Sequence, residues 1–188
     1  MPDVSDLRKG IKIKIDGQPH HITDFSFTKP GKGQAVYRCK IRNMINGNSF
    51  DKVYRSGDKF EKAELYSKTH LFSYVDGDEY VFVDPDTYDQ LYLNEDALGK
   101  QRYFLIDDCE CEILFFEDKA IEVALPNFVE KEIIRSEPGV RGDTATNVTK
   151  PAYLDNDYEI HVPIFVNEGD TVKIDTRTGE YSERVSKK

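Results

Sequence analysis

The stretch "TKPGKGQA", residues 28–35, presents a single lysine in a setting that could hold it out from the protein. Lys32 stands between Gly31 and Gly33, and Pro30 precedes them. Glycine admits positive φ and adds no bulky side chain, so a tight loop can form with Lys32 at its tip. Such a loop suits a lysine that reaches into a narrow nucleic-acid cleft. The alternative is a plain surface hairpin whose lysine is only solvated.

Further basic residues follow on the next segment, residues 35–42, "AVYRCKIR". In a strand, alternate side chains point to opposite faces. One face then carries apolar residues, and the other carries Arg38, Lys40 and Arg42, with Lys29 beside the loop. Basic strand residues of this kind are suited to contacts with phosphates.

Motifs of enzymes are missing from the sequence. It has no G-x-S-x-G, no P-loop and no H-E-x-x-H. His20 and His21 are adjacent, so on a strand they face opposite sides and cannot form one site. His70 and His161 have no Cys, Asp or Glu at ligand spacing nearby. We expect all four histidines to be structural or solvated.

The segment "DPDTYDQLYLNE", residues 84–95, has some features of a calcium loop. Asp84, Asp86 and Glu95 occupy the first, third and twelfth positions of an EF-hand pattern. However, Tyr88 stands at the fifth position, and Asp89 stands where the pattern requires glycine. We therefore expect an acidic, solvated surface here and no metal site.

The three cysteines, Cys39, Cys109 and Cys111, are expected to be small buried core residues. A reactive or metal-binding pair at 109 and 111 is the alternative. An odd cysteine count, together with an N-terminus that has no apolar stretch, favours a reducing cytoplasm. No apolar run approaches the roughly 20 residues of a membrane helix.

Charge is distributed unevenly along the 188 residues, whose net charge is −9. Residues 1–64 carry a net +5, residues 65–127 a net −11 and residues 128–188 a net −3. The basic third contains the lysine loop. This division favours an oriented encounter with a polyanion, while chance clustering of surface charge is the alternative.

Alternating apolar residues and turn signals predict a chain built mainly of short strands. Within residues 1–64 we expect strands over 11–16, 21–27 and 35–42, with turns at Asp16-Gly17 and Asn46-Gly47. Together they indicate a small curled antiparallel barrel. The two later modules, 65–127 and 128–188, are similarly rich in strands and turns. The pattern is typical of SH3-like or OB-type barrels.

The middle module is expected to contain hairpins around Asp76-Gly77 and Glu117-Asp118, with aromatic pairs formed by Tyr74, Tyr80 and Phe82. A short helix within 94–105 would begin at Asn94 and be limited by Gly99. In the third module, residues 158–166 are expected to form one strand with a face of Ile160, Val162, Ile164 and Val166. A hairpin at Thr178-Gly179 follows.

Several motifs together resemble the bacterial elongation factor P family. They are "KPGKGQA" followed by R-x-K-x-R, "FSYVDGDEYVFVD", "LPNFVEKEI", "PGVRGDTATNVTKPA" and "HVPIFVNEGDTVKIDTRTGEY". These motifs cover nearly the whole chain, although "YLDNDYEIHVP" departs from the usual pattern. The resemblance implies an all-β fold. An SH3-like, KOW-type barrel (1–64) would be followed by two OB-type barrels (65–127 and 128–188) in an L-shaped arrangement.

The resemblance also implies a function in translation. Family members bind both ribosomal subunits beside peptidyl-tRNA and stimulate bond formation between consecutive prolines. Lys32 matches the tip lysine that many members carry as β-lysyl-lysine. We therefore expect a cytoplasmic, monomeric, non-catalytic factor without a cofactor or membrane association. The sequence leaves open whether a lysyl-transferring enzyme modifies Lys32.

Specific residues can be matched to family sites by the same resemblance. Contacts with peptidyl-tRNA are implied for Lys29, Pro30, Gly31, Gly33, Gln34, Arg38, Lys40 and Arg42. Contacts near the exit-site codon or the small subunit are implied for Gly142, Asp143, Thr144, Tyr181 and Arg184.

Two other functional classes compete with this interpretation. A generic OB-fold binder of single-stranded RNA would show exposed aromatic residues on a basic face. The acidic composition of the OB-type modules counts against it, and we expect their charge to limit nonspecific RNA binding. An enzyme would need a catalytic set, which the sequence lacks.

Overall fold

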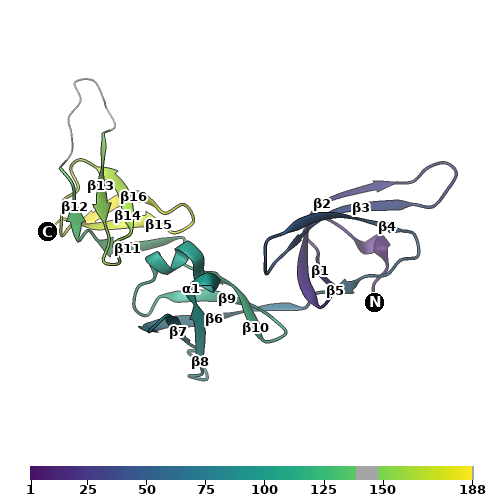
Figure 1. Ribbon diagram of the computed structural model, residues 1–188, viewed down its shortest axis with the longest axis horizontal. Coiled ribbons are helices and arrows are strands. Elements are labelled where there is room, and N and C mark those ends of the chain that lie inside the picture. Colours follow the sequence, from purple (N-terminus) through teal and green to yellow (C-terminus); the bar gives the residue numbers. More distant parts are fainter. Residues whose placement is uncertain (139–147, 188) are drawn as a thin grey trace. The chain divides into compact units, whose positions relative to one another are not determined.

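The computed structural model describes residues 1–138 and 148–187, and these consist mainly of antiparallel strands (Figure 1). By spatial contact, the chain divides into two compact units. One comprises Met1–Ser67 with Leu114–Ile121, and the other comprises Lys68–Ile113 with Glu122–Lys188. The predicted domain boundaries after residues 64 and 127 stay a prediction.

The first barrel is a five-stranded sheet in the order β4-β3-β2-β1-β5. Its elements are η1 (Val4–Asp6), β1 (Lys12–Ile15), β2 (Gln18–Thr28), β3 (Val36–Asn43), β4 (Ser49–Arg55) and β5 (Glu61–Lys62). The predicted turn between β1 and β2 is confirmed, with φ of 50° at Asp16 and 74° at Gly17. A two-residue hairpin turn of type I′ requires positive φ at both central residues, and Asp16 and Gly17 meet this requirement.

One face of this sheet closes over an apolar core. The core contains Val4, Leu7, Ile13, Ile22, Tyr37, Cys39, Ile41, Tyr54 and Phe60. Burial alternates residue by residue along β3, so the predicted division of its side chains between two faces is confirmed. Full burial of a side chain such as Ile41 contributes about 1.5–3 kcal/mol to folding. The register of β3 is therefore strongly constrained, because a slip of one residue would expose this apolar face.

The middle sheet has the order β10-β9-β6-β7-β8. Its strands are β6 (Leu65–Asp76), β7 (Glu79–Val83), β8 (Gln90–Asn94), β9 (Glu110–Phe116) and β10 (Lys119–Ala124). The predicted helix is confirmed as α1 (Glu95–Leu98), followed by the 3₁₀ helix η2 (Gly99–Phe104). The Asn94 side chain accepts a 3.0 Å hydrogen bond from the Ala97 amide, and Gly99 ends α1 with φ of 54°. Both capping residues could be predicted from the sequence, because asparagine is favoured at the start of a helix and glycine at its end.

A bulge in β6 changes one prediction for the middle module. The β6–β7 register shifts between Phe72 and Tyr74, so Phe72 pairs with Phe82 while Tyr74 pairs with Val81. The extra residue places Phe72 and Tyr74 on opposite faces, although strict alternation would place them together. Phe72 is therefore the ring that contacts Tyr80 and Phe82, at centroid distances of 6.3 and 5.6 Å. The predicted aromatic pairing of Tyr74 with these residues was wrong.

The third barrel consists of two three-stranded sheets, β11-β15-β16 and β12-β13-β14. Their strands are β11 (Phe128–Glu132), β12 (Arg135–Ser136), β13 (Thr149–Tyr153), β14 (Glu159–Pro163), β15 (Thr171–Asp175) and β16 (Glu180–Ser186). Phe104 of η2 is buried in the core of this barrel together with residues such as Val129 and Ile174. Tyr103 stacks on Tyr158 at 4.7 Å. The middle and third barrels thus share apolar contacts within one compact unit.

The strand predicted over residues 158–166 is shorter in the structure. β14 ends at Pro163, and a turn follows in which the Val166 amide donates a 3.0 Å hydrogen bond to the Pro163 carbonyl. Proline has no amide hydrogen and cannot donate to a ladder, which accounts for the end of the strand. Ile160, Val162 and Val166 are nevertheless buried, and Ile164 is half-buried.

All three cysteines are buried and free, which confirms their prediction as core residues. Burial raises the pKa of the Cys39 thiol. The Sγ atoms of Cys109 and Cys111 lie 3.9 Å apart. Contact with the Cys109 thiol, and then burial, raises the pKa of Cys111. Cys39 and Cys111 therefore remain protonated thiols at neutral pH.

Candidate nucleic-acid interface

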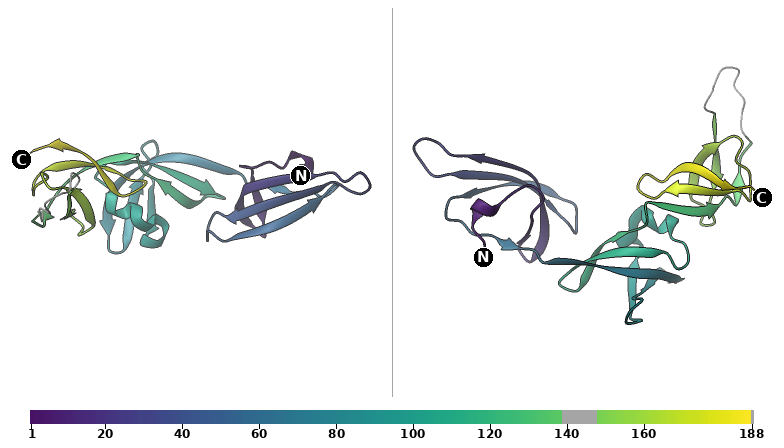
Figure 2. Two further views of the ribbon diagram at one scale, coloured as in Figure 1. Left: turned by 90° about the horizontal axis from the view of Figure 1, so that it is seen from above. Right: turned by 180° about the vertical axis from the view of Figure 1, so that it is seen from behind.

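The lysine loop connects the ends of the two longest strands of the first barrel. It joins β2 and β3, whose last paired residues are Thr28 and Val36. Figures 1 and 2 show the loop at the far end of these strands, beyond the rest of their sheet. Every residue from Lys29 to Gln34 is exposed, so the structure places all six predicted loop residues at the surface. The Lys32 ammonium is therefore presented to solvent at the end of a two-stranded arm.

The two glycines beside Lys32 have different backbone requirements. Gly33 has φ of 127°, in the region that favours glycine, whereas Gly31 has no positive φ. A Cβ added at Gly33 would lie 3.5 Å from the ring of Pro30, an ordinary contact distance. The need for glycine at position 33 is thus conformational and not a matter of space.

The base of the arm is held by aromatic and backbone contacts. Phe27 and Tyr37 face each other across β2 and β3 with ring centroids 5.0 Å apart, and Phe25 lies 6.3 Å from Tyr37. The Ser56 amide donates a 3.1 Å hydrogen bond to the Ala35 carbonyl at the start of β3. Cross-strand aromatic pairs stabilise such ribbons by a few tenths to about 1 kcal/mol each. These contacts limit the directions in which the loop can point.

The outer face of β3 carries the three predicted basic residues, and all three are exposed. Sequence reasoning missed two carboxylates on this face. Asp24 of β2 and Asp51 of β4 are each directly opposite Lys40 in the sheet register. Directly opposite side chains have Cβ atoms about 4.5–5.5 Å apart. Alternation along β4 places Asp51 on the outer face, but Asp24 reaches this face only because the β2–β3 register shifts between Ile22 and Asp24. Alternation alone would have placed Asp24 on the same inward face as Ile22, so the register was needed to show that both aspartates flank Lys40.

A depression of about 400 Å³ lies on this face. Its lining includes Asp24, Ser26, Arg38, Lys40, Asp51 and Lys52. The surface therefore has a mixed charge pattern, with cations along β3 and one carboxylate on each side of the central lysine. Such a pattern favours a ligand with spaced negative charges, because each aspartate repels a phosphate placed directly beside it.

The predicted sites of the third barrel have other contacts. Tyr181 is half-buried against the core of that barrel. Arg184 donates a 3.1 Å hydrogen bond to the Phe165 carbonyl and lies 3.4 Å from a carboxylate oxygen of Asp170. Both residues thus have structural roles. Gly142, Asp143 and Thr144 lie outside the described residues.

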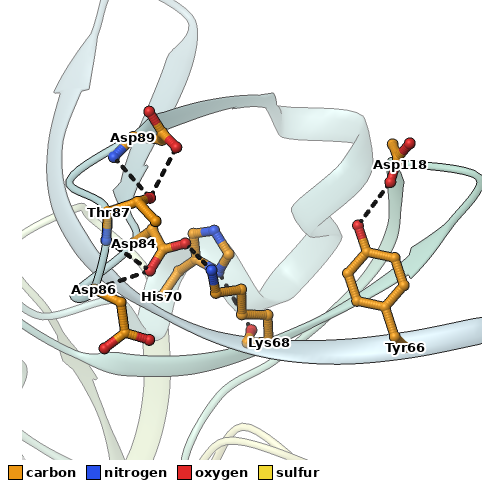
Figure 3. Close-up of polar contacts among 8 residues, drawn as sticks. All are labelled: Tyr66, Lys68, His70, Asp84, Asp86, Thr87, Asp89 and Asp118. Atoms are coloured by element: carbon orange, nitrogen blue, oxygen red, sulfur yellow. Dashed lines mark hydrogen bonds and ion pairs between the residues drawn. The ribbon is translucent and has the colours of Figure 1, made fainter.

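The segment with partial resemblance to a calcium loop is a hydrogen-bonded turn (Figure 3). The Asp84 carboxylate is paired with the Lys68 ammonium and accepts hydrogen bonds from the Asp86 and Thr87 amides. The lysine, and then these amides, hold the pKa of Asp84 well below its usual range. Its oxygens are already occupied by protein donors. Residues 1–138 and 148–187 contain no group of three or more side chains arranged to hold a metal ion.

Comparison with protein families identifies three consecutive matches. A domain described as "Elongation factor P (EF-P) KOW-like domain" matches residues 3–60. The "Elongation factor P (EF-P) OB domain" matches residues 65–123, and "Elongation factor P, C-terminal" matches residues 121–184. The KOW-like and OB matches agree with the all-β barrels of the structure.

Relatives match over almost their whole length. Elongation factor P of Desulfotalea psychrophila is 52% identical over 185 residues, which are 98% of this chain and 99% of the relative. The protein of the same name from Syntrophus aciditrophicus is 49% identical over 185 residues, with the same coverage. Elongation factor P 2 of Geobacter sulfurreducens is 47% identical over 185 residues, again covering 98% and 99%.

Two solved structures have a similar fold at low identity. Eukaryotic translation initiation factor 5A from Methanococcus jannaschii superposes with a TM-score of 0.53 and 24% identity, covering 66% of this chain and 90% of that structure. A translation initiation factor eif-5a family protein from Naegleria fowleri gives a TM-score of 0.54 and 14% identity, covering 66% and 96%. In the part of the chain that the structure describes, every helix is too short or too polar to span a bilayer.

Proposed function

Because the chain belongs to the elongation factor P family of translation elongation factors, we propose that it binds the ribosome beside peptidyl-tRNA and directs Lys32 toward the CCA end. There it stimulates peptide-bond formation at consecutive prolines. The exposed lysine at the end of the β2–β3 arm is the observation that carries this proposal. It provides a long cationic side chain in the exposed loop beyond the last pair of the arm, Thr28 and Val36.

The physical contribution in this proposal is positioning. Proline is a sterically hindered nucleophile, and a proline-rich nascent chain misplaces the peptidyl ester. A contact that holds the CCA end in a reactive pose removes part of the entropic and misalignment cost of the reaction. A lysine ammonium has three donors for phosphate, ribose or base oxygens. The factor itself supplies no acid, base or nucleophile in this scheme and acts without a cofactor.

The basic face of β3 supplies the second contact. Arg38, Lys40 and Arg42 bind the phosphate backbone of peptidyl-tRNA and thereby fix the orientation of the first barrel. Modification of Lys32 by a lysyl-transferring enzyme extends the reach of the arm and adds a further amine. The exposed loop and the absence of a bulky neighbour at either glycine are consistent with access by such an enzyme.

Substitution of Lys32 tests the proposal. Lys32→Ala should leave the melting temperature unchanged, because the side chain is exposed. It should abolish the rescue of a triproline reporter in a reconstituted translation system. Lys9→Ala, at another exposed lysine of the same compact unit, is the matched control and should retain rescue. Full rescue by Lys32→Ala would overturn the proposal.

A further inference from the structure

The outer face of the middle sheet carries two tyrosines that the proposed function of Lys32 and β3 does not involve. In the register, Tyr74 of β6 and Tyr92 of β8 lie on either side of Val81 of β7. Directly opposite residues point to the same face of a sheet. Asp76 and Glu79, opposite each other at the β6–β7 turn, share this face by alternation. We call these five residues the tyrosine face.

The two rings are only partly covered by the protein. Tyr74 is 44% exposed and Tyr92 is 43% exposed, whereas Val81 between them is fully buried. Part of each tyrosine side chain is therefore accessible to a ligand. Partly exposed tyrosines over an apolar base are typical of protein interfaces, where a rigid ring loses little conformational entropy on binding.

The negative charge of the tyrosine face disfavours nucleic acid as its ligand. The pKa of Tyr92 is raised, first by burial, then by the neighbouring Tyr74 hydroxyl, and further by the negative charges of Asp76 and Glu79. These four side chains are thus close enough to interact. Both carboxylates are exposed, and residues 65–127 have a net charge of −11. A phosphate backbone would be repelled here, although the outer face of an OB sheet with aromatic rings otherwise suits single-stranded nucleic acid.

The same features favour a cationic partner. An arginine guanidinium can lie over a tyrosine ring and also form paired hydrogen bonds with a carboxylate. Two rings and two carboxylates on one face provide such sites for more than one basic side chain. A Lys- or Arg-rich protein segment meets these requirements.

We propose that the tyrosine face docks a basic segment of a ribosomal protein. The inference rests on the proposed function, which brings the chain to a surface made of RNA and basic proteins. Docking gives the acidic middle barrel an attractive contact in surroundings that otherwise repel it. It also supplies an anchor that is independent of Lys32 and of the β3 cations.

Charge reversal distinguishes a protein partner from RNA, because the two predict opposite signs. The double variant Asp76→Lys with Glu79→Lys should weaken binding to purified ribosomes at least about fivefold if the face meets a basic segment. If the face meets RNA, the same variant should bind more tightly. Glu110→Lys with Glu112→Lys changes the net charge equally on exposed positions of β9 and is the matched control. Tighter or unchanged binding of the test variant, relative to this control, would overturn the proposal.

Photo-crosslinking identifies the partner directly. With a benzophenone amino acid in place of Tyr92, we expect a cross-link to a ribosomal protein at a Lys- or Arg-rich peptide. The same group at Phe128, which is 42% exposed in the third barrel, should not give that product. A cross-link from position 92 to ribosomal RNA would contradict docking on protein. If Lys32→Ala abolishes rescue while neither tyrosine-face experiment gives the expected result, this inference fails and the proposed function stands.

Discussion

The guanidinium of Arg184 donates a hydrogen bond of 3.1 Å to the backbone carbonyl of Phe165 and lies 5.0 Å from the centroid of the same residue's ring. The contact joins β16 to the connection between β14 and β15, two segments that are adjacent only in the folded chain. A residue that resemblance assigns to ribosome contacts is thus also a structural tie within the third barrel.

Removal of this tie should affect stability as well as activity. Arg184→Ala should lower the free energy of unfolding by about 1–2 kcal/mol, because a charged hydrogen bond and a ring contact are lost at a partly exposed site. Urea denaturation measures this change. Arg55→Ala, at an exposed arginine of β4, is the control and should have little effect. Unchanged stability of Arg184→Ala would instead favour a role confined to ribosome contacts.

Lys32→Arg separates positive charge from modification. Arginine keeps the charge and the reach of the arm, but it has no ε-amine that can be aminoacylated. We expect the variant, made in its native host, to lose most of the triproline rescue. Lys29→Arg, at the start of the same loop, should retain it. The intact mass of the parent protein should show one added lysyl group. If the parent has an unmodified mass and full activity, modification of Lys32 is not required for rescue.

The charges on and beside β3 predict that some substitutions weaken ribosome binding and that others strengthen it. Replacement of Arg38, Lys40 and Arg42 by Glu should weaken ribosome binding at least about tenfold. It should also reduce the slope of log affinity against log salt by about 0.7–0.9 for each lost phosphate contact. Asp24→Asn with Asp51→Asn should have the opposite effect, because these carboxylates flank Lys40. Affinity of the Glu variant within about twofold of the parent at about 0.1 M salt would show that this face does not meet RNA.

The Asp84–Lys68 pair predicts a pH dependence of stability. The pKa of Asp84 is lowered in the folded protein, mainly by the Lys68 ammonium. In the unfolded chain an aspartate has a pKa of about 3.9. The pair therefore stabilises the protein above about pH 4, and its contribution is lost as the pH falls further. Asp84→Asn should lower the urea midpoint at pH 7, and the difference from the parent should shrink in acid.

Asp86→Asn, at an exposed position of the same turn, is the control for this comparison. It should follow the parent at every pH. A constant difference between Asp84→Asn and the parent from neutral to acidic pH would show that the charge of Asp84 does not contribute.

Much of the local structure could be predicted because its causes lie within a few residues. Alternation along β3 predicted which side chains are buried, and the residue types at Asp16-Gly17 and Asn94 predicted a turn and a helix cap. The proline and glycines beside Lys32 predicted an exposed loop between two strands. Resemblance of motifs spread along the chain predicted the family.

The rest depended on contacts between distant segments. No local signal marked the bulge after Phe72, yet it moves Tyr74 to the outer face beside Tyr92. Only the pairing of three strands placed Asp24 and Asp51 beside Lys40, and only the packing of the third barrel gave Arg184 its tie to Phe165. Most strands and turns, and the lysine at the tip, could be predicted because backbone preference and alternation are local. Which charges and rings share a face could not be predicted, because strand register and bulges are fixed by the burial of whole sheets.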